Sequence, residues 1–150
     1  MHELNRLFEN KFRCKLFCPP VSSQSTLHNA VKGNINFPEL VATIGLIINE
    51  IWHKEIDKLL TSKPPTGSIN KIKALLDEKD INYDNDTISI PRTLYSIRNT
   101  TFPLHETGPD VINHLKRLDI IYSNNDTKDA AYKILQSFDL CLITMKGWFK

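Results

Sequence analysis

Hydrophobic residues recur every three or four positions along most of this chain, which is the period of amphipathic helices. The clearest series spans residues 38–62 and predicts a long, mostly buried helix with Pro38 in its first turn. A second long helix is predicted over residues 127–145, where an apolar stripe follows a capping Asn125 or Asp126. These two helices are expected to form the spine of the fold.

Shorter helices are predicted around this spine, and no segment shows the alternation of a strand. We expect them over residues 2–17, 69–79 with Ser68 as the cap, 90–101, and from about Pro109 onward. Two stretches are assigned mainly to loops, namely residues 19–36, with one helical turn at "TLHNAV", and "NYDNDTIS". The pattern therefore predicts an all-α bundle that forms a single domain over residues 1–150.

Composition narrows the class of protein. The chain is 41% hydrophobic and 24% charged, and its net charge of +2 is too small to indicate nucleic-acid binding by itself. The most apolar segment, "LVATIGLIINEIW", is too short to span a membrane, and the N-terminus lacks the apolar run of a signal peptide. We therefore expect a cytoplasmic protein that does not enter the membrane.

Metal and cofactor sites are not expected. Three cysteines, Cys14, Cys18 and Cys141, do not form a disulfide framework, and the first two lack the further ligands of a zinc site. His53 and Asp57 lie four residues apart and amount to half a metal site, but an exposed polar helix face explains them more simply. No glycine-rich phosphate loop is present.

The candidate chemistry lies in the segment "YSIRNTTFPLH", which contains Arg98, Asn99 and His105. On an unbroken helix, positions 98 and 105 would be separated by about 10 Å along the axis. Phe102 and Pro103 are expected to end or kink the helix between them, so that His105 approaches Arg98. Arginine offers a planar cationic fork for phosphate, histidine transfers protons near neutral pH, and asparagine orients an imidazole or stabilises an oxyanion.

These side chains would suffice for metal-free RNA cleavage, in which the ribose 2′-hydroxyl attacks the adjacent phosphate and leaves a 2′,3′-cyclic phosphate. One histidine cannot easily serve as both base and acid, whereas two copies in two subunits could. An ordinary structural interpretation also accounts for the residues. Arg98 would pair with a carboxylate, Asn99 would cap the helix, and His105 would lie in a surface loop.

The R-N-x5-H pattern in a small all-α domain resembles the HEPN superfamily. "LYSIRNTTFPLH", followed by the helix "DTKDAAYKILQSFDLCLITM", is similar to the C-terminal HEPN-like domain of abortive-infection proteins. The resemblance implies a HEPN-like core over about residues 38–145, preceded by an N-terminal helix and loop over residues 1–37. Arg98 matches the motif arginine, Asn99 the polar residue after it, and His105 the motif histidine.

The same resemblance implies a function and partners. It implies a metal-independent endoribonuclease that acts as a toxin or antiphage effector, dimerises to form a composite site, and is restrained by an antitoxin or regulatory protein. Lys116 and Arg117 are candidate contacts for RNA phosphates, although a solvated helix face is the simpler interpretation, and His114 is expected to face solvent. Two alternatives remain, a non-catalytic HEPN-like module that binds a partner protein or nucleotide, and a helical DNA-binding protein.

Overall fold

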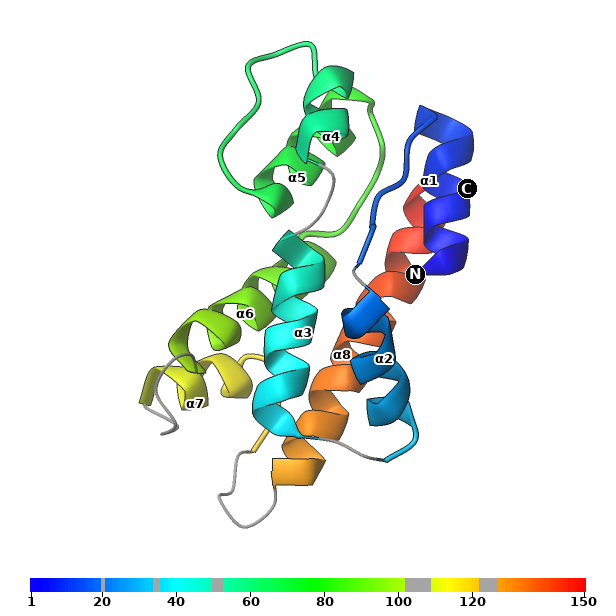
Figure 1. Cartoon of the computed structure of the whole chain (residues 1–150). Helices are drawn as coiled ribbons and strands as arrows, with labels where there is room; N and C mark the ends of the chain where they lie inside the picture. Colours follow the sequence, from blue (N-terminus) through cyan, green and yellow to red (C-terminus); the bar gives the residue numbers. More distant parts are fainter. Residues whose placement is uncertain (20, 34–35, 50–52, 102–108, 122–126) are drawn as a thin grey trace.

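The computed structural model describes residues 1–19, 21–33, 36–49, 53–101, 109–121 and 127–150. This part of the chain contains helices and no strand (Figure 1), which confirms the all-α prediction. The helices are α1 (His2–Phe12), α2 (Val21–Val31), α3 (Phe37–Asn49), α4 (His53–Leu59), α5 (Ser68–Glu78), α6 (Asn85–Thr101), α7 (Pro109–Lys116) and α8 (Thr127–Trp148).

Three helices, α3, α6 and α8, pack against one another and form the centre of the fold. The other helices cover them: α2 lies against α3, α7 against α6, and α1 against α8. Figure 1 shows α4 and α5 together at one end of the molecule and α7 near the other. One cluster of buried apolar side chains joins these elements, with fully buried members that include Leu4, Ile44, Leu75, Ile97 and Ile134.

Of the two predicted spine helices, one is found with a longer C-terminal end and the other corresponds to two separate helices. Helix α8 covers the whole of the predicted segment 127–145 and continues to Trp148. The predicted segment 38–62 corresponds to α3 and α4, with residues 50–52 outside the described part of the chain. Pro38 lies in the first turn of α3 as expected, and the Asn36 side chain accepts a hydrogen bond from the Glu39 backbone N–H at 3.1 Å.

The N-terminal third differs most from the prediction. Helix α1 ends at Phe12 rather than at residue 17, because Arg13 adopts a left-handed conformation with φ of 61°. The Asn5 side chain then bonds to both backbone groups of Phe17, at 2.6 and 2.7 Å, which returns the chain along α1. The segment assigned mainly to a loop contains the eleven-residue helix α2, with Ser23 and Ala30 buried.

Helix α6, which carries the candidate chemistry, begins at Asn85, five residues before its predicted start at Ile90. Asp84 caps it by accepting hydrogen bonds from the Thr87 hydroxyl at 2.5 Å and the Thr87 backbone N–H at 2.6 Å. These bonds also lower the pKa of Asp84. Pro91 therefore lies inside the helix and cannot donate to the Thr87 carbonyl, which instead contacts the thiol of Cys141 at 3.7 Å.

Helix α5 begins after a Gly67 cap rather than at a Ser68 cap, and Gly67 has a φ of 89°. At the other end of α5, the carboxylate of Glu78 accepts hydrogen bonds from the backbone N–H and hydroxyl groups of both Thr61 and Ser62. The Ser62 hydroxyl and the Thr61 backbone N–H contribute most to lowering its pKa to about 2. Glu78 thereby ties the segment after α4 to α5.

This carboxylate makes stability depend on pH in a defined window. Because the folded-state pKa of about 2 lies below the ordinary value of 4.5, the ionised form stabilises the fold above pH 4.5, and this contribution is lost as pH falls toward 2. Glu78→Gln should therefore be less stable than the wild type at neutral pH, and the difference should shrink steadily below pH 4.5. Urea unfolding from pH 7 to pH 2 measures it, and a pH-independent difference would contradict the assignment.

Candidate functional site

The last turn of α6 presents Arg98 and Asn99 together. The helix continues to Thr101, so Asn99 is an exposed helical residue and not a C-cap. The Arg98 Nη1 group donates a hydrogen bond to Asn99 Oδ1 at 3.1 Å, and the guanidinium carbon lies 5.8 Å from the centre of the Tyr95 ring. A cation is favoured at this end of a helix by the helix dipole.

The aliphatic stem of Arg98 is held by a close approach between α6 and α3. Gly45, which is buried on α3, faces this stem directly. A Cβ atom at position 45 would lie 2.7 Å from Arg98 Cγ and 2.9 Å from Arg98 Cβ, closer than carbon atoms approach. A glycine is therefore required at position 45 for Arg98 to keep this conformation.

The guanidinium group of Arg98 has no carboxylate partner among the described residues. The alternative interpretation, in which Arg98 forms an ion pair with a carboxylate, is therefore not observed in the described part of the chain. A guanidinium carries five N–H donors, and only one of them has a partner among the described residues, at Asn99. With respect to this part of the chain, the group keeps most of its capacity to bind an anion.

Arg98 lies at the edge of a groove of about 500 Å³ between α2 and α3. This volume is within the range of roughly 300–1,000 Å³ typical of small-molecule sites. Hydroxyl and amide side chains supply most of the polar lining, and the remaining charged group is the Glu39 carboxylate, which accepts a hydrogen bond from Thr26 at 3.1 Å. The lining residues include Ser22, Ser23, Thr26, Asn36, Thr43 and Arg98.

The remaining predicted site residues do not gather at this groove. His105 lies in residues 102–108, outside the described part of the chain, so its proximity to Arg98 stays a prediction. Lys116 and Arg117 are both exposed at the end of α7 and are not among the described residues that line the groove. Lys116 is the last residue of α7, which packs against α6, and Arg117 follows it directly.

Two other polar residues differ from expectation. His114 was expected to face solvent, but its side chain is half-buried and its Nδ1 atom has no hydrogen-bond partner among the described residues. Asp57, one half of the considered metal pair, lies 2.7 Å from the Lys71 ammonium. Within the described residues, no three histidine, cysteine, aspartate or glutamate side chains gather where they could hold a metal ion.

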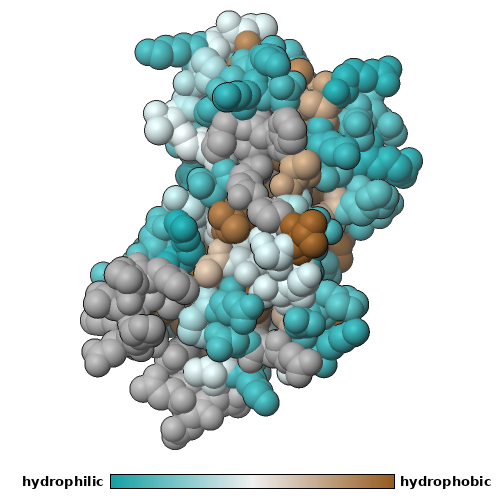
Figure 2. All heavy atoms as spheres, viewed as in Figure 1, coloured by the Kyte–Doolittle hydropathy of each residue, from teal (hydrophilic) through white to brown (hydrophobic). Residues whose placement is uncertain are grey.

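The groove could not be anticipated from the sequence, because one of its two walls is the unexpected helix α2. Figure 2 shows a mainly hydrophilic face with only scattered apolar side chains near its middle.

Comparison with family models, curated proteins and solved structures finds no match to this chain. Among the described helices, none is both long and apolar enough to cross a membrane. The candidate site therefore depends on the geometry of Arg98 and on the motif that contains it.

Proposed function

We propose that this protein is a metal-independent endoribonuclease of the HEPN type. The observation that supports the proposal is the Arg98 guanidinium, which lies at the edge of a polar groove with no carboxylate partner among the described residues. A positioned and unneutralised arginine is suited to bidentate binding of a phosphate. The motif residue His105 follows α6 by only four positions, within the segment that connects α6 to α7.

In the proposed reaction, neutral His105 removes the proton from a ribose 2′-hydroxyl. The resulting oxygen attacks the neighbouring phosphorus, the bond to the 5′-oxygen of the next nucleotide breaks, and that oxygen is protonated on leaving. Arg98 stabilises the charge that accumulates on the non-bridging oxygens, and Asn99 holds the guanidinium through the bond between them. The products are a 2′,3′-cyclic phosphate and a 5′-hydroxyl.

A single His105 cannot act as base and acid in the same step, so we propose a homodimer in which two copies of the motif face one another. The HEPN resemblance implies this arrangement, and it also implies a toxin or antiphage effector restrained by a partner protein. Lys116 and Arg117, exposed at and just after the end of the neighbouring helix α7, are placed in the proposal as contacts for the RNA backbone.

The proposal is tested by incubating the purified protein with mixed-sequence RNA in EDTA. We expect cleavage that leaves 2′,3′-cyclic phosphate ends, no cleavage of DNA with the same sequences, and loss of cleavage in His105→Ala. His28→Ala is a matched control, because His28 is an exposed histidine on α2. The His28→Ala protein should cleave RNA at the wild-type rate. Cleavage that requires a divalent metal, or that survives in His105→Ala, would contradict the proposal.

A second candidate is a non-catalytic HEPN-like module that binds a partner protein or nucleotide in the same groove. The Glu39 carboxylate favours it, because a groove that carries both Arg98 and a negative charge suits a ligand with groups of both signs. Absence of cleavage, together with a stable complex that Glu39→Gln and Arg98→Met both weaken, would support this candidate over the nuclease.

A further inference from the structure

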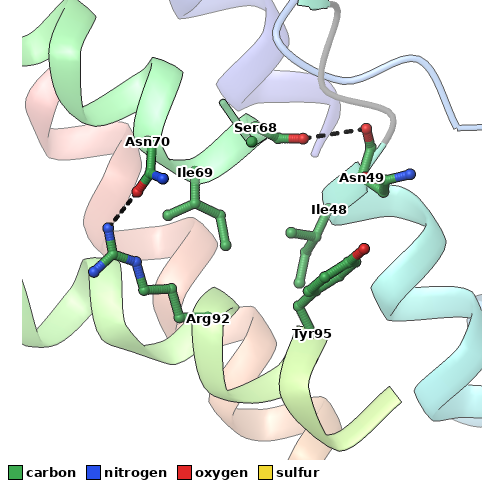
Figure 3. A pocket seen from close by; sticks show the side chains of 8 residues that line it. Ile48, Asn49, Ser68, Ile69, Asn70, Arg92 and Tyr95 are labelled. Carbon is green, nitrogen blue, oxygen red and sulfur yellow. Dashed lines mark hydrogen bonds between the residues drawn. The ribbon is translucent and has the colours of Figure 1, made fainter. Parts of the chain in front are cut away.

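A second cavity lies where α3, α5 and α6 meet, and its volume is about 180 Å³ (Figure 3). Ile48 and Ile69 provide an apolar lining, while Ser68, Asn70, Arg92 and Tyr95 provide polar groups. Figure 3 shows Arg92 extending from α6 toward Asn70 on α5, and Tyr95 extending from α6 toward Ile48 and Asn49 on α3. Neither the R-N-x5-H motif nor the groove at Arg98 includes this cavity.

Arg92 is oriented by a short chain of hydrogen bonds. Its Nη2 group donates to Asn70 Oδ1 at 2.6 Å, and Asn70 Nδ2 in turn donates to the Thr66 carbonyl at 2.9 Å. Because the amide of Asn70 is fixed at both ends, it holds the guanidinium in place through one donor. The other N–H groups of Arg92 have no partner among the described residues, so the fork can bind an anion.

The surroundings of Arg92 favour a negative charge. No aspartate or glutamate is among the described residues that line the cavity. Helix α5 begins at its edge, its first turn contains no acidic residue, and its Gly67 cap supplies no side-chain acceptor. The positive end of the helix dipole therefore adds to the charge of Arg92.

Tyr95 gives the cavity a planar, apolar wall beside the cation. Its ring lines the cavity and also lies beneath the Arg98 guanidinium, and its hydroxyl makes no hydrogen bond among the described residues. Arg92 and Tyr95 lie three residues apart on α6 and therefore share one helix face. A ligand with an anionic group next to a flat or apolar part would satisfy both.

We propose that this cavity binds the phosphate group of a nucleotide, with Arg92 as its main ligand and the sugar or base against Tyr95 and the two isoleucines. The cavity is smaller than the roughly 300 Å³ at the lower end of whole-ligand sites, so it suits one phosphate with part of its nucleoside. The phosphate belongs either to an RNA strand or to a free mononucleotide. This inference does not depend on the nuclease proposal.

Isothermal titration calorimetry of the intact protein against a short oligoribonucleotide, a nucleoside monophosphate and inorganic phosphate tests the proposal. Wild-type protein should bind at least one of the two nucleotide ligands more tightly than inorganic phosphate. Preference for the oligoribonucleotide assigns the phosphate to a strand, whereas equal affinity for the monophosphate assigns it to a free nucleotide. Absence of binding by all three at millimolar concentration would overturn the proposal.

Arg92→Gln should weaken binding of the nucleotide by about tenfold or more, because it removes the charge-assisted donors while the amide can still bond to Asn70. Arg92→Lys keeps the charge but not the planar fork of the guanidinium. Its affinity for the nucleotide should lie between those of the wild type and Arg92→Gln. Arg6→Gln is the matched control, since Arg6 is an exposed arginine on α1. This substitution should not change the affinity for the nucleotide. Equal affinities for Arg92→Gln and wild type would overturn the proposal.

The two proposals fail separately. Binding that requires Arg92, in a protein that cleaves no RNA, would support the cavity and reject the nuclease. Cleavage that requires His105, in a protein whose nucleotide affinity is unchanged by Arg92→Gln, would support the nuclease and reject the cavity.

Discussion

Under the proposed nuclease mechanism, replacing Arg98 with methionine should lower the rate of RNA cleavage by about 100-fold or more, while the protein remains folded. Methionine is an unbranched side chain that occupies much of the space of the arginine stem against Gly45, so the packing of α6 on α3 is kept. What is lost is the cation at the groove. Alanine is the less informative change, because it would also remove the stem atoms that fill the contact with Gly45.

The stability of Arg98→Met should change by only about 1 kcal/mol, because the interactions lost among the described residues are one hydrogen bond to Asn99 and the cation–π contact with Tyr95. Single-turnover cleavage at saturating RNA and urea unfolding measure the two quantities independently. Arg98→Lys keeps the charge without the planar fork and should retain an intermediate rate.

Arg6→Met provides the control for loss of a positive charge elsewhere, since Arg6 is exposed on α1. It should cleave RNA at the wild-type rate. An Arg98→Met protein that also cleaved at the wild-type rate would remove arginine from the proposed mechanism. A protein that lost cleavage only because it unfolded would be recognised from the urea titration.

The long helices were predictable because their sequence pattern and their packing agree. In α8, the apolar stripe in the sequence is the stripe that is buried in the structure, including Ile134, Phe138 and Cys141. The same holds for α3, whose apolar residues Leu40, Ile44 and Ile48 lie in the core. Periodicity reports burial directly when the apolar stripe of a helix faces the core.

Helix α2 and the start of α6 were missed because their local sequence favours loops. Helix α2 is rich in serine, and serine competes for backbone hydrogen bonds outside helices. Packing against α3 overcomes this preference. In α6, Pro91 suggested a helix start, whereas the capping contact between Asp84 and Thr87 places the start earlier. A capping residue and a proline both predict a helix start, and here the cap identifies the correct one.

The candidate site was likewise predictable only in part. The motif with Arg98 and Asn99 could be read from the sequence, and the bond between their side chains follows from their position at the end of one helix. The role of Gly45 could not be read, because it depends on a contact between residues 53 positions apart on two helices. Sequence patterns identify chemical groups, but the crossing of two helices decides which groups share a cavity.

The largest effect on stability is expected at Phe8, which anchors α1 to α8. Its side chain is fully buried, and its ring centre lies 4.7 Å from that of Phe12 and 5.0 Å from that of Phe149. Phe8→Ala removes this ring from a closed aromatic cluster and should lower the free energy of unfolding by about 3–5 kcal/mol. That is a large share of the roughly 5–15 kcal/mol typical of a folded domain.

Phe12→Ala is the matched control, because Phe12 belongs to the same cluster but is only half-buried. Its replacement leaves a smaller cavity and should lower the free energy of unfolding by less than Phe8→Ala does. Urea unfolding followed by tryptophan fluorescence in a Trp52→Phe background reports on the cluster itself, because the ring centre of Trp148 lies 6.4 Å from that of Phe149. Because Phe8 does not line the groove at Arg98, RNA cleavage by the folded fraction of Phe8→Ala should be unchanged. Equal costs for Phe8→Ala and Phe12→Ala would contradict the assignment of Phe8 as the centre of the cluster.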